Sequence, residues 1–286
     1  MTRPILRSLL FTPADNPEMM RKAVETAADA CIFDLEDAIP KNRQEMARDH
    51  LREVGTSLDF GDKFVFARIE SAESDYWLED LRAAVDAGVD GVHIPKVEST
   101  YDIHLVTEAA AQLTDEPPLF RIGIETPEGV FSGVDIARFC RDIPSVFGIG
   151  FGAADYCREI GAPEINDRVK DFMAHVFIGY AALGELDAFA SGTLEIDNLD
   201  RLRTLLENQR ELGFVGATCI HPSQIETIND VFTPDADEYE RAKRLVDEYD
   251  DHEGDSVVVD EVFLDTATAD RYRDIVDRFE RFNPAD

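Results

Sequence analysis

Basic residues are scarce in this sequence, and lysine is especially rare. The 286 residues include 28 Lys and Arg against 60 Asp and Glu, which gives a formal net charge of −32. Only six of the basic residues are lysine, so 28 − 6 = 22 are arginine. Molar salt screens repulsion between such charges, because the Debye length falls to about 3 Å at 1 M. The composition therefore predicts adaptation to a salt-filled cytoplasm, as in halophilic archaea, and it argues against nucleic acid as a partner.

Several other signals are missing. No stretch approaches the roughly 18 apolar residues of a membrane-spanning helix, and no long apolar segment of the signal-peptide kind follows the charged residues at the N-terminus. The four cysteines, at positions 31, 140, 157 and 219, form no C-x-x-C pair, which disfavours a zinc site or a disulfide framework. Neither a P-loop nor a nucleophile-elbow pattern occurs. We expect a cytoplasmic protein without membrane contacts.

Eight short runs rich in β-branched and aromatic residues recur along the chain, most of them separated by helix-length segments. Near-continuous apolar runs are typical of strands buried on both faces of a parallel sheet. Eight repeats favour closure into a (β/α)₈ TIM barrel over an open sheet, and we place this barrel in residues 1–233. The expected strands are residues 7–13, 30–37, 64–70, 91–97, 119–126, 146–152, 187–191 and 216–222, with helical patterns such as 17–28, 75–87 and 198–212 between them.

Residues 234–286 exceed what an eight-stranded barrel requires. Residues 239–249 and 266–282 have helical patterns, and residues 255–259 and 262–264 predict a short hairpin between the two helices. We expect this C-terminal extension to cover the active site as a lid or to reach a neighbouring subunit.

Carboxylate residues stand at the ends of two neighbouring apolar runs. Barrel enzymes carry their active sites at the C-terminal ends of the strands, and a charged residue is costly to bury there unless it is paired or binds a metal. Glu125 ends the fifth run and Asp155 follows the sixth. Two carboxylates completed by water and substrate oxygens are typical of Mg²⁺, with Mn²⁺ as the alternative ion, whereas zinc favours His and Cys ligands. The competing interpretation is that each carboxylate caps a helix or forms a rim salt bridge.

Other charged residues also stand at strand ends. Arg68 ends the third run, where a guanidinium either clamps a carboxylate and stabilises an oxyanion, or forms a rim ion pair with Glu36 or Asp37. We interpret Lys96 as part of a structural ion pair. His221 is interpreted as a hydrogen-bonded structural residue rather than a general base.

Several motifs follow one another along nearly the whole chain. They are Arg7-Ser-Leu-Leu-Phe-Thr-Pro13, Phe33-Asp-Leu-Glu-Asp-Ala38, Trp77 with Asp80-Leu81, Ile94-Pro-Lys-Val-Glu98, Ile124-Glu-Thr-Pro127, Gly152-Ala-Ala-Asp155 and Cys219-Ile-His-Pro-Ser-Gln224. In this order they resemble the HpcH/HpaI aldolase superfamily, in particular its citrate lyase β-subunit-like and malyl-CoA lyase-like enzymes.

The resemblance implies a (β/α)₈ barrel assembled as a homotrimer or homohexamer. It implies Mg²⁺ on Glu125 and Asp155 and a substrate anion on Arg68. It also implies that Asp265 acts as the catalytic acid or base from the neighbouring subunit.

The resemblance extends to residues around the second strand. It places Glu36 and Asp37 in the catalytic site, and Asp37 stands where the simpler 2-oxo-acid aldolases of the superfamily carry a histidine, which points to the coenzyme A branch. Lys22, Lys41 and Arg43 fall in regions that the family uses for the phosphates of coenzyme A.

The activity implied by the resemblance is a reversible carbon–carbon lyase on a 3-hydroxyacyl-CoA thioester, such as malyl-CoA or β-methylmalyl-CoA, that gives glyoxylate with acetyl-CoA or propionyl-CoA. Three alternatives stay open: a malyl-CoA thioesterase, a citrate lyase β subunit that requires an acyl-carrier partner, and a non-catalytic barrel that binds CoA esters. Two departures from the family pattern, Glu70 in place of Asn and Glu261 in place of Gly, are expected near the substrate pocket.

Overall fold

The computed structural model describes residues 3–252 and 254–283. The chain divides into two compact units, of which the first ends at Asn229 and the second begins at Asp230. The boundary expected from the sequence, between residues 233 and 234, lies four residues further along. None of the described helices is long and apolar enough to cross a membrane.

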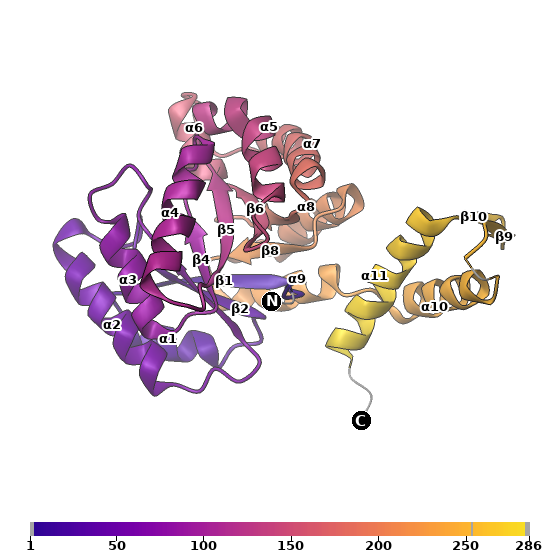
Figure 1. The fold of residues 1–286 in the computed structure, drawn as a ribbon, viewed down its shortest axis with the longest axis horizontal. Helices are drawn as coiled ribbons and strands as arrows, with labels where there is room; N and C mark the ends of the chain where they lie inside the picture. Colours follow the sequence, from indigo (N-terminus) through magenta and orange to yellow (C-terminus); the bar gives the residue numbers. More distant parts are fainter. Residues whose placement is uncertain (1–2, 253, 284–286) are drawn as a thin grey trace. The chain divides into compact units, whose positions relative to one another are not determined.

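The first unit is a closed barrel of eight parallel strands in the order β1 to β8, with β1 paired to β8 (Figure 1). Each strand is followed by a helix, and the helices surround the barrel. This confirms the predicted (β/α)₈ fold, including its seventh strand. The strands are β1 (Ser8–Pro13), β2 (Ala30–Asp34), β3 (Phe64–Arg68), β4 (Gly91–Ile94), β5 (Leu119–Ile124), β6 (Val146–Phe151), β7 (Asp187–Ser191) and β8 (Gly216–Cys219).

The helices around the barrel begin at local sequence signals. Thr126 caps α5 by accepting a hydrogen bond from the backbone N–H of Gly129 at 3.1 Å, and Pro127 takes the first helical position. Glu125 is therefore fixed between a strand end and a helix start. The helices are α1 (Pro17–Val24), η1 (Lys41–Arg43), α2 (Gln44–Ser57), α3 (Trp77–Ala87), α4 (Thr100–Leu113), α5 (Pro127–Arg141), α6 (Ala153–Glu159), α7 (Asp167–Gly184), α8 (Leu199–Leu212), η2 (Pro222–Gln224) and α9 (Ile225–Phe232).

Several elements end earlier than the sequence pattern suggested. β2 ends at Asp34 instead of residue 37, and β4 ends at Ile94 instead of residue 97. Beyond β2 the carboxylate of Asp34 accepts hydrogen bonds from the backbone N–H groups of Glu36 (3.0 Å) and Ala38 (3.2 Å), which turn the chain out of the sheet. Beyond β4 the backbone of Lys96 has a φ of 49°, which no strand residue adopts. Helix α1 likewise stops at residue 24 instead of 28.

Side chains fill the barrel in layers. One layer is apolar and includes the buried residues Leu9, Ile32, Phe66, Leu119, Phe147 and Phe189. Two residues further along the strands, the register pairs Asp34 with Arg68, Arg68 with His93, and His93 with Arg121. Because alternate residues of a strand share a face, these four side chains form a polar layer across β2 to β5, nearer the C-terminal ends of the strands.

The second unit has a small apolar core of its own. Helices α10 (Ala236–Asp251) and α11 (Thr266–Phe282) pack with a hairpin of β9 (Val257–Val259) and β10 (Val262–Leu264). The buried residues of this core are Leu245, Tyr249, Leu264 and Ala269. These elements agree with the helices and hairpin expected from the sequence.

Candidate active site

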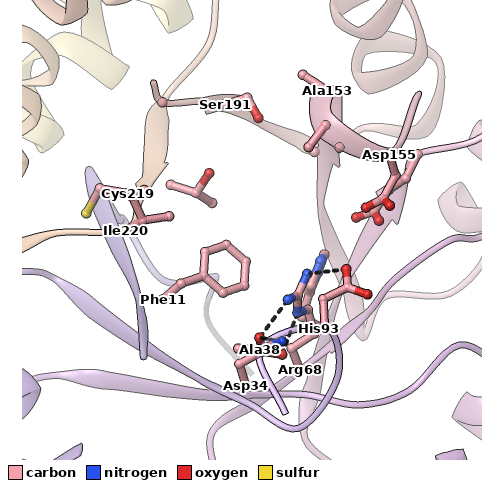
Figure 2. Close-up of a pocket in the computed structure, with 18 of the residues that line it drawn as sticks. Phe11, Asp34, Ala38, Arg68, His93, Ala153, Asp155, Ser191, Cys219 and Ile220 are labelled. Atoms are coloured by element: carbon pink, nitrogen blue, oxygen red, sulfur yellow. Dashed lines mark hydrogen bonds and ion pairs between the residues drawn. The ribbon is translucent and has the colours of Figure 1, made fainter. Parts of the chain in front are cut away.

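A cavity of about 450 Å³ opens at the C-terminal ends of the barrel strands (Figure 2). The predicted site residues Asp37, Arg68, Glu125 and Asp155 all line it, as do residues from each of the eight strands or the loops that follow them. Among the other lining residues are Phe11, Asp34, His93, Arg121, Ser191 and Thr218.

Glu125 and Asp155 enter this cavity from neighbouring strands. Glu125 directly follows β5, and Asp155 stands in the first turn of α6, after β6. Glu125 is buried, and its Oε2 atom has no hydrogen-bond partner. Burial raises the pKa of Glu125 to about 7; Arg68 opposes this rise and the charge of Asp155 adds to it. The two carboxylates therefore carry more negative charge than the nearby basic residues neutralise, and a bound cation would balance it.

Two glycines make room for the Glu125 side chain. A Cβ atom on Gly152 would lie 2.4 Å from Cγ of Glu125, and one on Gly123 would lie 2.7 Å from its Oε1 atom. Neither position accepts a larger residue without displacement of the carboxylate. The backbone of β5 and of the loop after β6 is thus closely fitted to this side chain.

The two carboxylates fit a Mg²⁺ site. This ion is typically held by one or two carboxylates and completes its oxygen ligands with water and substrate. Within the described parts of the chain, no group of three or more His, Cys, Asp and Glu side chains is placed to hold a metal. Asp155 also contacts Arg158 Nη2 at 2.5 Å, but Arg158 is 72% exposed on the same helix and can move aside.

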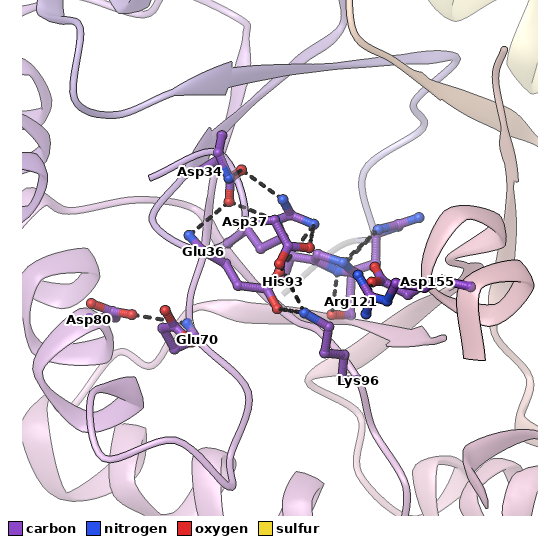
Figure 3. Close-up of polar contacts among 12 residues, drawn as sticks. Asp34, Glu36, Asp37, Glu70, Asp80, His93, Lys96, Arg121 and Asp155 are labelled. Carbon is purple, nitrogen blue, oxygen red and sulfur yellow. Dashed lines mark hydrogen bonds and ion pairs between the residues drawn. The ribbon is translucent and has the colours of Figure 1, made fainter. Parts of the chain in front are cut away.

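Asp34, Glu36, Asp37 and Lys96 belong to a charged network (Figure 3). Arg68 forms ion pairs with the three carboxylates of this network. Its Nε and Nη2 atoms donate to the two carboxylate oxygens of Asp34 at 2.7 Å. Its Nη1 atom lies 3.1 Å from Glu36 and 3.8 Å from Asp37, as ion pairs. Lys96 Nζ donates to Glu36 at 2.5 Å and to Asp37 at 3.1 Å. The rim ion pair considered for Arg68 and the structural ion pair of Lys96 are therefore both present.

The network limits the number of N–H donors of Arg68 that are available to a substrate. A guanidinium binds one carboxylate through its fork, and Asp34 occupies the Nε–Nη2 face. Only Nη1 faces the remaining carboxylates. Glu36 does not line the cavity, and burial raises its pKa to about 8 while Arg68 acts in the opposite direction. Its position is that of a residue that holds Arg68 and Lys96 in place.

Sequence reasoning missed three residues of the polar layer: Asp34, His93 and Arg121. All three are buried and line the cavity. The prediction of site residues used only the ends of the apolar runs, whereas these three residues lie inside the runs. A polar residue inside an otherwise apolar strand was the signal that could have identified them.

The residues expected at the coenzyme A phosphates do not line the cavity. Lys22 stands in the last turn of α1 and pairs with Glu18 at 2.8 Å. Because α1 starts at the C-terminal ends of the strands, its last turn lies toward the opposite end of the barrel. Lys41 and Arg43 belong to η1, which directly follows the β2 loop on the C-terminal side.

Two further residues have local structural contacts. His221 Nδ1 accepts a hydrogen bond from the backbone N–H of Ser223 at 3.2 Å. Glu70 was expected near the substrate pocket. It does not line the cavity, and its side chain accepts a hydrogen bond from Gln44 in α2.

Asp265, in the second unit, is the N-cap of α11. Its carboxylate accepts a hydrogen bond from the backbone N–H of Thr268 at 2.8 Å. This cap engages the Oδ1 atom of the carboxylate.

Residues 7–222 match the family described as HpcH/HpaI aldolase/citrate lyase. The chain is 32% identical over 254 residues to a protein of Cereibacter sphaeroides named (3S)-malyl-CoA thioesterase, covering 86% of this chain and 84% of that one. It is 28% identical over 247 residues to citrate lyase subunit beta of Leuconostoc mesenteroides subsp. cremoris, covering 84% and 81%. Among solved structures, protein CitE from Mycobacterium tuberculosis in complex with magnesium, acetoacetate and coenzyme A aligns with a TM-score of 0.77 and 25% identity, over 97% of this chain and 99% of that one. The chain therefore belongs to the HpcH/HpaI aldolase/citrate lyase family.

Proposed function

We propose that this protein is a Mg²⁺-dependent carbon–carbon lyase that acts reversibly on a 3-hydroxyacyl-CoA thioester such as malyl-CoA or β-methylmalyl-CoA. The observation that carries the proposal is the pair Glu125 and Asp155 inside the cavity, with one buried oxygen of Glu125 left without a partner. The similar CitE structure contains magnesium and coenzyme A, which supports both groups here. Mn²⁺ is the alternative ion.

Cleavage requires one proton to leave the substrate and one to be returned. Glu125 and Asp155 would hold the ion, which would supply Lewis-acid chemistry to the substrate oxygens. The hydroxyl proton passes to a water molecule as that oxygen becomes the carbonyl of the 2-oxo acid and the carbon–carbon bond breaks. The bonding electrons pass into the thioester fragment as an enolate, whose carbon then takes up a proton. Arg68 lines the cavity, and its Nη1 atom would stabilise the negative charge that develops there.

We assign the proton transfer at the enolate carbon to Asp265 of a neighbouring subunit. The hydrogen bond from Thr268 lowers the pKa of Asp265. As an ionised carboxylate, Asp265 is in the form that removes a proton in the condensation direction. Exposed aromatic residues on the first unit, Phe131 in α5 (88% exposed) and Phe172 in α7 (68%), support a subunit interface, because such residues are enriched at interfaces. The homotrimer or homohexamer that we propose rests on the family resemblance.

Coenzyme A brings several negative charges to a protein of net charge −32, so local basic residues are needed to hold its phosphates. Lys41 and Arg43 are our proposed contacts, because η1 lies on the C-terminal side of the barrel. Lys22 is further from this face, and we propose it only as a source of positive charge.

A malyl-CoA thioesterase is the second candidate, favoured by the 32% identity to the protein of that name. In that reaction a water molecule attacks the thioester carbonyl in the same cavity, and the products are free malate and coenzyme A. The similarity to citrate lyase subunit beta keeps a third reaction open, the cleavage of a citryl thioester on a carrier partner to give oxaloacetate. A non-catalytic barrel that binds CoA esters is the remaining alternative.

The deciding experiment incubates the purified protein with malyl-CoA and Mg²⁺ in molar KCl and measures glyoxylate and malate separately. We expect glyoxylate and acetyl-CoA in equal amounts, and their loss in Glu125→Gln. The matched control is Glu159→Gln, an exposed acid at the end of α6 outside the cavity. Free malate as the product would identify the thioesterase, and binding of malyl-CoA without turnover would refute both enzymatic proposals for this substrate.

A further inference from the structure

Arg121 is a buried cation at the floor of the cavity. It belongs to the polar layer on β5, is 4% exposed and lines the cavity. Among the residues that the structure describes, no carboxylate forms a salt bridge with it, and its Nε atom has no hydrogen-bond partner. Glu125 acts on it only as a neighbouring charge.

The other arginines in the barrel interior and on its inner helix faces are neutralised. Arg68 forms a two-point contact with Asp34, and Arg48 donates to the buried Asp80 at 2.7 Å. The polar layer itself contains two guanidinium groups but a single carboxylate, Asp34. Burial lowers the pKa of Arg121 to about 10, so the side chain is still charged at neutral pH. A buried charge without a partner costs free energy of folding. A role in binding a ligand would explain why the protein keeps such a charge.

The contacts of Arg121 position it without neutralising it. Its Nη1 atom lies 3.0 Å from Nδ1 of His93, and burial holds the pKa of His93 well below its usual range, so the imidazole is neutral. The guanidinium carbon lies 5.5 Å from the centre of the Phe189 ring. A Cβ atom on Gly150 would lie 2.0 Å from Nη2 of Arg121. The glycine therefore leaves a space that the guanidinium fills.

One charged group in β5 and one just after it line the same cavity. Arg121 lies in β5, and Glu125 directly follows the strand, four residues further along the chain. Neutralisation of Glu125 by a bound cation would remove the one carboxylate whose charge favours Arg121. The need of Arg121 for an anion is then greatest when the proposed metal site is filled.

We propose that Arg121 is a specificity-determining residue that receives a carboxylate of the 2-oxo acid at the floor of the cavity. This rests on the proposed function, and it differs from the expectation that Arg68 is the main clamp, because the fork of Arg68 is already engaged by Asp34. The carboxylate comes either from the group next to the carbonyl or from a second acidic group at the far end of the molecule. A second acidic group would make the preferred acid a dicarboxylate.

Calorimetric titration of the Mg²⁺-loaded protein with pyruvate and with freshly prepared oxaloacetate tests the proposal without turnover. We expect Arg121→Gln to weaken binding by about 10–100-fold, the range of a charge-assisted hydrogen bond, and Arg121→Lys to recover part of the loss. Weakening with both acids identifies the carboxylate next to the carbonyl. Weakening confined to oxaloacetate identifies the distal one.

Melting temperature separates binding from structure. Because Arg121 has no carboxylate to leave behind, Arg121→Gln should keep or raise the melting temperature of the ligand-free protein. The matched control is Arg48→Gln, which leaves buried Asp80 without its partner and should lower the melting temperature while oxo-acid binding persists. Unchanged affinities in Arg121→Gln, or a wild-type protein that binds neither acid, would overturn the proposal. Absence of lyase activity in a wild-type protein that binds the acids through Arg121 would refute only the proposed reaction.

Discussion

Replacement of Gly152 by alanine tests whether the cavity is built around the Glu125 side chain. Gly152 precedes α6 with φ −85° and ψ 82°, values that an alanine adopts without backbone strain. The added Cβ atom would lie 2.4, 2.5 and 2.8 Å from Cγ, Cδ and Cβ of Glu125. These contacts involve the stem of the side chain as well as its tip, so a simple rotation of the carboxylate does not relieve them.

The structure allows a magnitude for this change. The backbone N–H of Gly152 donates to the carbonyl of Ile124 at 3.1 Å, which resists movement of the loop away from β5. Overpacking of a filled interior costs about 1–3 kcal/mol. For a unit of this size, each 1 kcal/mol lowers the melting temperature by about 2–4 °C, so we expect a fall of about 2–12 °C. Displacement of the carboxylate should weaken Mg²⁺ binding by about 10–100-fold, the usual effect of disturbing the groups around a metal ligand.

Gly179→Ala is the matched control. Gly179 lies in α7, and an added Cβ atom meets no other atom within 4 Å. Alanine favours the helix by up to about 1 kcal/mol over glycine, so this variant should melt at the same or a higher temperature with unchanged Mg²⁺ affinity. The two measurements are calorimetric unfolding and Mg²⁺ titration in molar KCl. Wild-type values of both in Gly152→Ala would refute the fitted geometry inferred around Glu125.

Three other predictions concern the metal, the salt and the second unit. Chelation should abolish turnover and added Mg²⁺ or Mn²⁺ should restore it; full activity in a metal-free sample contradicts the site. Melting temperature should rise with KCl through the molar range, because 60 acidic residues face 28 basic ones, and a flat response contradicts this reading. Asp265→Asn should lower carbon–carbon bond chemistry by about 10²–10⁴-fold with little change in melting temperature, since asparagine still caps α11. Mixed oligomers with subunits that lack Glu125 should recover activity, and no recovery would place Asp265 outside the neighbouring site.

The fold could be predicted from the sequence because each strand carries its own signal. Even β7, with only five residues, keeps three buried apolar positions in a row. The strand ends could not be predicted in the same way. The chain leaves β2 because the Asp34 carboxylate binds two backbone N–H groups, and it leaves β4 near a residue with positive φ. Both causes depend on side-chain and backbone geometry that apolar periodicity does not contain.

The place of Glu125 and Asp155 in the cavity could be predicted, because both follow strand ends, where barrel active sites lie. The polar residues within the strands were a usable signal, but strands buried on both faces do not show which alternate residues point inward, so the polar layer itself could not be assembled from the sequence. Glu261 is a different case. It has a φ of 65° in the hairpin turn, a region that favours glycine, so the turn geometry accounts for a glycine at this position and the structure does not explain the glutamate.

Three of the six lysines donate hydrogen bonds to carbonyl or carboxylate oxygens of the barrel unit. Lys63 donates to two backbone carbonyls before β2 at 2.6 and 2.7 Å, and Lys96 holds two carboxylates at the rim. Lys170 is buried and donates to the carbonyl of Gly192, a residue that lines the cavity, at 2.5 Å. An ammonium group directs three donors to separate acceptors, which a planar guanidinium does not reproduce at such a site. Lys63 and Lys96, which each donate to two acceptors, therefore occupy positions that depend on this geometry. At molar salt, with a Debye length of about 3 Å, the anionic thioester that we propose as substrate would approach the protein without long-range repulsion, so short contacts would have to recognise it. Low salt would then oppose both the compact fold and the encounter with substrate.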